Sequence, residues 1–125
     1  MIFGIGTDIV EITRIQKAIA ASERFASRIL TDFEMAEYLD SKQQERYLAK
    51  KFAAKEALVK AMGTGIGNGY SWQMMQVEHT ELGKPYFLYF GALKDFITDN
   101  DIVNCQLSIS DEQTYATAMV VLETQ

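Results

Sequence analysis

Two acidic residues, Asp8 and Glu56, have surroundings in this sequence that suggest chemistry. Asp8 lies in the apolar stretch IFGIGTDIVEI, where strand alternation places it on one face with Gly4 and Gly6. Glu56 lies in KKFAAKEALVKAM, whose apolar residues recur with the period of a helix. Carboxylates among apolar neighbours must be paired, hydrogen-bonded or bound to an ion. With no histidine or thiolate nearby, these oxygen donors favour Mg²⁺ or Mn²⁺ over Zn²⁺.

Three lysines of the same helical stretch, Lys51, Lys55 and Lys60, could supply positive charge to phosphate groups. The segment GTGIGNG at residues 63–69 could offer backbone N–H groups to phosphate oxygens. It is not a P-loop, because it follows a helix and lacks the terminal Gly-Lys-Ser/Thr. Two alternatives involve no chemistry: a surface ion pair between Glu56 and Lys60, which are spaced i, i+4, and a flexible glycine connection.

The length of 125 residues, 48% of them hydrophobic, predicts a single domain spanning residues 1–125. No apolar run approaches 18 residues, and MIFGIGTDIVEI lacks the features of a signal peptide, so we expect a cytoplasmic protein with no membrane segment. The single Cys105 excludes an internal disulfide. The single His79, expected to be a solvated turn residue, removes most histidine-dependent catalysis.

Charge is distributed unevenly along the chain. The net charge of −5 argues against nucleic acid as the main partner. Ten of the twelve lysines and arginines nevertheless lie between Arg14 and Lys60. This asymmetry indicates a basic surface for an anionic ligand or an acidic partner, with a solvated helical face as the alternative.

The predicted elements fall into a helical first half and a strand-rich second half. A strand over 2–12 precedes successive helices over 13–62, whose starts are indicated by Thr13, Thr31 and Ser41, each followed three residues later by Gln or Glu. Gly63 is the expected cap of the last and longest helix.

Beyond Gly69 the pattern predicts strands over 71–79, 85–90, 102–109 and 114–123, with a helix over 92–100. The last two strands should form an antiparallel hairpin. Because the final strand is apolar on both faces, it should be central in its sheet or covered by a partner subunit.

The stretches GIGTDIVEITRI (4–15) and KFAAKEALVKAMGTGI (51–66) resemble the bacterial holo-[acyl-carrier-protein] synthases of the 4′-phosphopantetheinyl transferase superfamily. The segments ERFASRILTDFE, NGYSWQMMQVEHTELGKPYF and LSISDEQTYATAMVVLE fit the same pattern in order, so the resemblance covers essentially the whole chain. It implies an α+β domain with an antiparallel sheet wrapped around a long helix and with N-terminal helices. It also implies a homotrimer with active sites between subunits.

The implied reaction is transfer of 4′-phosphopantetheine from coenzyme A to a serine of apo acyl carrier protein, for fatty acid biosynthesis. It releases adenosine 3′,5′-bisphosphate. The resemblance places Asp8 and Glu56 on Mg²⁺ together with the coenzyme A diphosphate, and Lys60 on the phosphates, where it would protonate the leaving group. The serine's general base stays open among Glu56, a metal-bound water and a carboxylate of the carrier protein.

Other implied roles concern binding. The residues expected to bind coenzyme A are Lys51, Lys60, Gly63, Thr64 and Gly65, with Lys51 near the 3′-phosphate. The residues expected to dock acyl carrier protein are Arg14, Arg24, Phe25 and Arg28.

The sequence departs from the family pattern at Asp111, because many members carry there a histidine that helps to hold the 3′-phosphate. Two rival functions therefore stay open. One is a non-catalytic module that binds coenzyme A or a carrier protein, and the other is a metal-dependent phosphotransferase acting on a nucleotide alone.

Overall fold

A computed structural model describes all 125 residues of the chain. The elements alternate in the predicted order, with a short 3₁₀ helix added after the glycine-rich segment. In sequence they are β1 (Ile2–Glu11), α1 (Ile12–Ala21), α2 (Arg24–Ile29), α3 (Asp32–Asp40), α4 (Gln44–Met62), η1 (Trp72–Met74), β2 (Met75–His79), β3 (Pro85–Tyr89), α5 (Gly91–Asp99), β4 (Ile102–Asp111) and β5 (Tyr115–Thr124).

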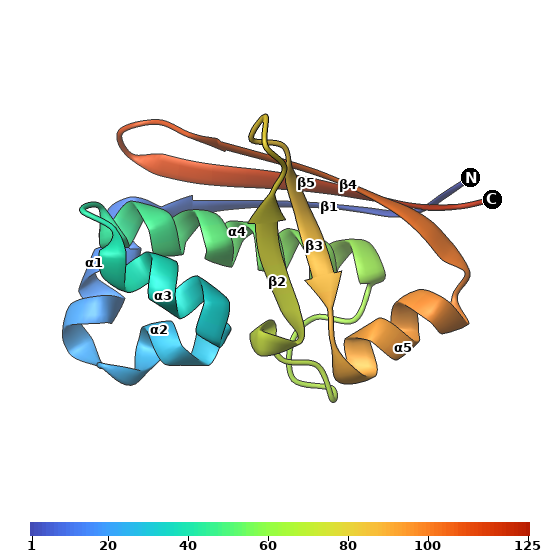
Figure 1. Cartoon of the computed structure of the whole chain (residues 1–125), viewed down its shortest axis with the longest axis horizontal. Helices are drawn as coiled ribbons and strands as arrows, with labels where there is room; N and C mark the ends of the chain where they lie inside the picture. The colour runs from blue at the N-terminus through green and yellow to red at the C-terminus, as the bar shows by residue number, and fades with distance from the viewer.

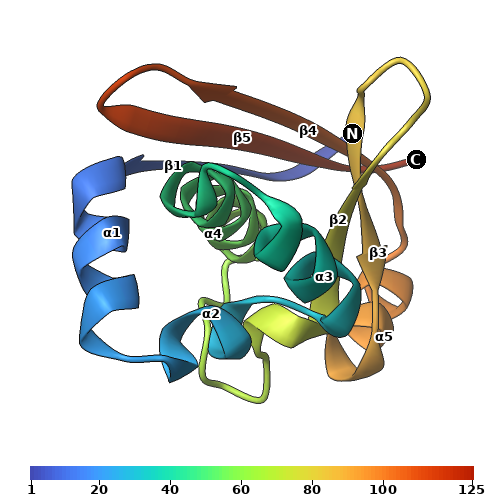
Figure 2. The ribbon, with the colours of Figure 1, turned by 60° about the vertical axis from the view of Figure 1, so that its left-hand side comes forward.

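The long helix α4 lies at the centre of the architecture (Figure 1). An antiparallel three-stranded sheet of order β1-β5-β4 covers one side of it, and the antiparallel pair β2-β3 packs separately. Viewed nearly along α4, the helices α1, α2 and α3 and the β2-β3 pair surround the sides that the sheet leaves open (Figure 2). The predicted α+β class, with an antiparallel sheet around a long helix, is confirmed.

The predicted position of the last strand is also confirmed. β5 pairs with both β1 and β4, so its two edges are satisfied inside the sheet. It forms with β4 the expected antiparallel hairpin, although β4 extends two residues beyond the predicted end, to Asp111. The strand predicted over 71–79 starts only at Met75, because Trp72–Met74 form the 3₁₀ helix η1.

Glycines in β1 allow the strand to lie against the backbone of α4. A Cβ atom added to Gly6 would lie 2.0 Å from the carbonyl oxygen of Ala57, and one added to Gly4 would lie 2.0 Å from that of Ala61. Both alanines are buried. Small residues on the two elements therefore let the backbones approach closely, as the face of glycines and the alanine-rich helix predicted.

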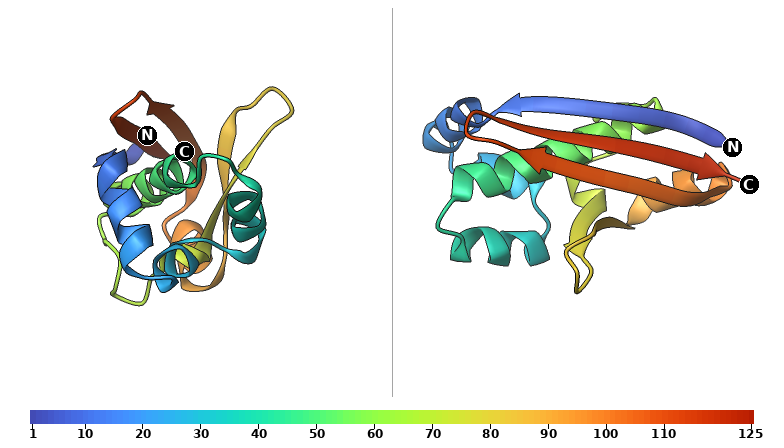
Figure 3. Two further views of the ribbon diagram at one scale, coloured as in Figure 1. Left: turned by 90° about the vertical axis from the view of Figure 1, so that its left-hand side faces the viewer. Right: turned by 90° about the horizontal axis from the view of Figure 1, so that it is seen from above.

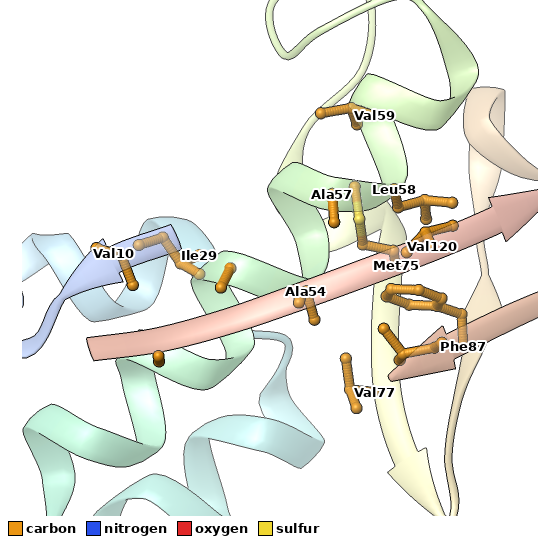
Figure 4. Close-up of a cluster of buried hydrophobic side chains, with 14 of the residues drawn as sticks. Val10, Ile29, Ala54, Ala57, Leu58, Val59, Met75, Val77, Phe87 and Val120 are labelled. Carbon is orange, nitrogen blue, oxygen red and sulfur yellow. The ribbon is translucent and has the colours of Figure 1, made fainter. Parts of the chain in front are cut away.

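The hydrophobic core is one cluster of 26 buried residues around α4. Figure 4 shows Met75, Val77 and Phe87 of the β2-β3 pair gathered beside Leu58 of α4 and Val120 of β5. Both the sheet and the β2-β3 pair are thus anchored on the same helix. No helix in the structure combines the length and the apolar character that crossing a membrane requires.

Only one of the three predicted capping boxes forms. Thr31 accepts a hydrogen bond from the Glu34 backbone, and the Glu34 side chain accepts one from the Thr31 backbone. The caps predicted at Thr13 and Ser41 are wrong, because α1 begins earlier, at Ile12, and α4 begins later, at Gln44. The predicted end of α4 is confirmed: Gly63 adopts the left-handed conformation, with φ of 80°.

We predict that Gly6→Ala destabilises the fold by at least about 3 kcal/mol, because the added methyl group would force β1 away from the Ala57 carbonyl. The measurement is the free energy of unfolding in urea.

Gly83→Ala is the matched control. Gly83 has a φ of +91°, but nothing lies within 4 Å of an added Cβ. Its substitution should therefore cost only the backbone strain, about 1–2 kcal/mol. If Gly6→Ala and Gly83→Ala lowered the free energy of unfolding equally, a close approach of β1 to α4 would be contradicted.

Candidate functional site

Asp8 is placed at the contact between β1 and α4. It shares the face of β1 that bears Gly4 and Gly6, and its side chain is 15% exposed. Its Oδ1 accepts a hydrogen bond from Lys60 Nζ at 3.1 Å. The same ammonium group donates to the Thr7 carbonyl oxygen at 3.0 Å. The Lys60 side chain is 54% exposed, so the charge pair stays accessible to a ligand.

Glu56 lies one helical turn before Lys60, about 6 Å along the axis of α4. It does not form the ion pair with Lys60 that was the alternative interpretation of their spacing, because Lys60 pairs with Asp8. The Oε2 atom of Glu56 instead accepts a hydrogen bond from Nε1 of Trp72 at 3.1 Å. Sequence reasoning missed Trp72, which is 16 residues away and belongs to another element.

The free carboxylate oxygens of Asp8 and Glu56 are donors of the kind that a hard divalent cation takes. Each carboxylate uses one oxygen in a protein hydrogen bond, which leaves Asp8 Oδ2 and Glu56 Oε1 without a donor. The structure contains no group of three or more His, Cys, Asp or Glu side chains able to hold a metal. One or two carboxylates are what Mg²⁺ takes from a protein when water and substrate phosphate complete its shell.

A cavity of about 570 Å³, here called the β1 cavity, opens beside Asp8 and Lys60. All three strands of the β1-β5-β4 sheet contribute to its wall. Four hydroxyl side chains line it: Thr7, Ser108, Ser110 and Thr117. Glu56 does not line this cavity. Ile9, Ala118 and Met119 complete its wall. The space beside Asp8 and Lys60 therefore combines polar and apolar groups, and it can admit a charged, hydrogen-bonding ligand.

Lys55 does not contribute charge to a ligand site, contrary to the sequence prediction. The residue is wholly buried, and its Nζ donates to Glu34 Oε1 at 2.6 Å, to the Ile29 carbonyl at 2.6 Å and to the Trp72 carbonyl at 3.0 Å. Burial lowers the pKa of Lys55, whereas the Glu34 carboxylate favours its charged form. All three ammonium hydrogens have acceptors, so the role of Lys55 is structural.

Lys51 lies in a different cavity, of about 260 Å³, which we call the Lys51 cavity. Tyr47, His79 and Asp111 line the same space. Lys51 is only 4% exposed and forms no ion pair, although its Nζ lies 4.7 Å from the centre of the Tyr47 ring. Burial lowers the pKa of Lys51. The structure thus places Lys51 apart from Asp8 and Lys60 within one chain.

His79 is exposed, as expected, although it ends β2 rather than occupying the turn. Partial desolvation of the imidazole lowers its pKa, and the positive charge of Lys51 lowers it further.

Asp111 has a partner that sequence reasoning missed. Its Oδ2 accepts a hydrogen bond from Arg46 at 2.7 Å, and the same guanidinium nitrogen donates to the Glu112 carbonyl at 2.7 Å. The contact ties the β4-β5 hairpin to the first turns of α4. The two residues are 65 positions apart, and no local pattern marks them as neighbours.

The start of the glycine-rich segment does not offer the free N–H groups that the sequence suggested. The N–H groups of Gly63, Thr64 and Gly65 all point back to the Val59 carbonyl, at 3.1, 3.2 and 3.4 Å. They satisfy the end of α4 instead of forming a phosphate cradle. The Thr64 hydroxyl donates to the Gly65 carbonyl at 3.2 Å.

The predicted docking residues occupy two consecutive helices. Arg14 of α1 and Arg24 and Arg28 of α2 are exposed and form no ion pair with a carboxylate of the chain. Phe25 differs from them, because it is only partly exposed and its ring centre lies 6.5 Å from that of Phe52. The arginines form an available basic surface, and Phe25 beside them also packs against Phe52 of α4.

Comparison with known proteins gives consistent matches over nearly the full length. Residues 4–120 match the model of the 4′-phosphopantetheinyl transferase superfamily. The holo-[acyl-carrier-protein] synthase of Vibrio cholerae serotype O1 is 51% identical over 124 residues, covering 98% of each chain. That of Nitrosospira multiformis is 50% identical over 124 residues, covering 98% of this chain and 99% of the relative.

Solved structures give the same result. The crystal structure of the holo-[acyl-carrier-protein] synthase from Neisseria meningitidis superposes with a TM-score of 0.94 at 44% identity, over 99% of this chain and 100% of that one. The synthase from Bacillus anthracis, solved in complex with CoA (3′,5′-ADP), gives 0.85 at 37% identity, over 100% and 99% of the two chains.

Proposed function

Because this chain belongs to the 4′-phosphopantetheinyl transferase superfamily, we infer that it transfers 4′-phosphopantetheine from coenzyme A to a serine of apo acyl carrier protein. The products are holo acyl carrier protein, for fatty acid biosynthesis, and adenosine 3′,5′-bisphosphate. The observation behind this conclusion is the sequence identity of about 50% between this chain and holo-[acyl-carrier-protein] synthases, over nearly the whole length of both. The Asp8–Lys60 pair, whose lysine is exposed beside the β1 cavity, offers the charged groups that such a transfer needs.

The transfer breaks the phosphoanhydride bond of the coenzyme A diphosphate and forms a phosphoester bond to serine. The serine Oγ bonds to the phosphorus that carries pantetheine, the bond from that phosphorus to the bridging diphosphate oxygen breaks, and the serine loses its proton. We propose that Asp8 and Glu56 hold Mg²⁺, with Mn²⁺ as a substitute, and that the bound metal offsets charge on the diphosphate. We propose that Lys60, whose ammonium group lies 3.1 Å from Asp8 Oδ1, donates a proton to the leaving oxygen.

We propose that the chain works as a homotrimer, and the free face of its sheet supports this. α4 covers one face of the β1-β5-β4 sheet and no element covers the other, as the views in Figure 3 show. Ile5 and Ile9 of β1 and Met119 of β5 are exposed on the uncovered face, Ile9 at 63%. A second subunit would remove this apolar surface from water. It could also bring one chain's Lys51 cavity towards a neighbour's Asp8 and Lys60.

The first prediction concerns the two carboxylates. Asp8→Ala and Glu56→Ala should each lower transfer at least about a thousandfold, because several kcal/mol of charge stabilisation are lost. Mass spectrometry of an apo carrier protein incubated with coenzyme A and Mg²⁺ measures the gain of the phosphopantetheine mass.

Glu81→Ala, which alters an exposed carboxylate in the β2-β3 turn, is the control and should leave transfer unchanged. Near-normal turnover in the Asp8 or Glu56 variant would contradict the proposal that this residue holds Mg²⁺. If the unaltered chain gave no mass gain at all, a binding module would be the better description. Consumption of nucleotide without carrier protein would instead favour the simpler phosphotransferase.

The second prediction concerns assembly. Ile9→Glu should convert the trimer to monomers, because it places a charge in the proposed contact, and sedimentation equilibrium measures the change. Leu82→Glu is the control, since Leu82 is fully exposed in the β2-β3 turn, away from the sheet face. A monomer in the unaltered chain at micromolar concentration would rule out the trimer.

The third prediction concerns Lys51, for which we propose contact with the 3′-phosphate of coenzyme A. Its buried ammonium group has no ion-pair partner in the chain, so an anion would satisfy it. Lys51→Met should raise the KM for coenzyme A about tenfold, the loss of one charge-assisted contact. The KM for 3′-dephospho-coenzyme A should not change. Equal effects on both substrates would disprove a specific 3′-phosphate contact.

The fourth prediction concerns docking of the carrier protein, which we propose to involve Arg14, Arg24 and Arg28 together with Phe25. Reversing two of these charges, Arg14→Glu with Arg24→Glu, should weaken carrier-protein affinity about tenfold, because an acidic partner is repelled. Calorimetric titration measures the affinity, and Lys94→Glu on α5 is the exposed control. Unchanged affinity would mean that this basic surface is only a solvated helical face.

A further inference from the structure

Two consecutive residues of α4 hold Trp72 at two points. Lys55 Nζ donates to the main-chain carbonyl of Trp72 at 3.0 Å, and the indole Nε1 of Trp72 donates to Glu56 Oε2 at 3.1 Å. Lys55 is itself fixed by its buried pair with Glu34 at 2.6 Å. Both the backbone and the ring of Trp72 are therefore held against the part of α4 that carries Glu56.

Neighbouring contacts restrict the indole further. The Trp72 ring lies against that of Phe52, with a centroid separation of 5.9 Å and an angle of 45° between the planes. The next residue, Gln73, donates from its side chain to the carbonyls of Ser27 and Leu30. The 3₁₀ helix η1 is thus anchored to both α2 and α4, and the indole N–H has a fixed direction.

The direction of this hydrogen bond matters for the carboxylate. An indole N–H can only donate, so it does not compete with Glu56 for a cation. It occupies Oε2, while Oε1 accepts no hydrogen bond and stays available. A glutamate with one oxygen fixed loses less rotamer freedom when its other oxygen binds an ion. Partners of this kind orient the side chains that ligate a metal.

We propose that Trp72 is a positioning residue for Glu56, whose second oxygen it presents to the divalent cation. The proposal rests on the function proposed above, in which Glu56 binds Mg²⁺. In this role Trp72 acts through Glu56, and not on the metal or the reacting phosphorus. Its effect should appear in metal binding more than in the rate at saturating metal.

The test is Trp72→Phe, which keeps an aromatic ring beside Phe52 and removes the N–H donor. The Mg²⁺ concentration for half-maximal transfer should rise about tenfold, within the range found when such partners are removed. The rate at saturating Mg²⁺ and the KM for carrier protein should change little. Direct Mn²⁺ binding with coenzyme A present, followed by the electron paramagnetic resonance signal of free Mn²⁺, should weaken by the same factor.

Tyr70→Phe is the matched control. It also removes a polar atom from an aromatic residue of the same segment, but Tyr70 contacts Phe96, at 6.0 Å between ring centres, and donates no hydrogen bond to Glu56. It should leave Mn²⁺ affinity unchanged. Unchanged Mn²⁺ affinity in Trp72→Phe, with thermal stability preserved, would overturn the proposal.

A second measurement uses the unaltered protein, so it can be made even if Trp72→Phe does not fold. Trp72 is the only tryptophan of the chain, so intrinsic fluorescence reports on this residue alone. Titration with Mn²⁺ in the presence of coenzyme A should quench the emission at the concentrations that saturate transfer, and Glu56→Gln should abolish the response. Emission that stays constant while Mn²⁺ binds would overturn the proposal.

The Mn²⁺ affinities of two variants distinguish a wrong metal assignment for Glu56 from a wrong role for Trp72. If the metal assignment to Glu56 is wrong, Glu56→Gln binds Mn²⁺ as tightly as the unaltered chain. If only the role of Trp72 is wrong, Glu56→Gln loses Mn²⁺ affinity whereas Trp72→Phe retains it.

Discussion

The close approach of β1 to α4 is the constraint on which the rest of the structure depends. Hydrogen atoms at Gly4 and Gly6 are all that fits between the strand and the carbonyls of Ala57 and Ala61. This contact places Asp8, two residues beyond Gly6 on the same face, within hydrogen-bond reach of Lys60. The sheet, through β1 and β5, is then positioned over the helix. The distance between two backbones thus sets the geometry of the charged pair.

Neighbouring charged residues of α4 have different roles, and this difference is the second feature on which the structure depends. Successive side chains on a helix point about 100° apart, so Lys55 and Glu56 face different surroundings. Lys55 is directed into the core, where Glu34 and two carbonyls satisfy it, and this joins α3 and η1 to α4. Glu56 is directed towards Trp72. One turn of helix therefore carries a structural charge, Lys55, and the carboxylate of Glu56, for which we propose metal binding.

Local patterns were sufficient for much of the fold. The period of two in the first strand predicted that Gly4, Gly6 and Asp8 share a face, and the structure confirms the close packing that this implies. The end of α4 at Gly63 and the capping box at Thr31 were also predicted, because each depends on residues a few positions apart. The central position of the last strand followed from its apolar residues on both faces.

The sequence by itself determined the order of elements, the faces that are buried and the two carboxylates that suit a cation, because side-chain type and local periodicity encode these properties. Only the tertiary structure decided what surrounds Lys51, Lys55 and Lys60 of α4. Lys51, Lys55 and Lys60 are alike in charge and lie on the same helix, yet Lys51 lies in its own cavity, Lys55 is buried against Glu34 and Lys60 pairs with Asp8. The partners that distinguish them come from distant parts of the chain. A charge acquires its role from what packs against it, and that packing exists only in the folded molecule.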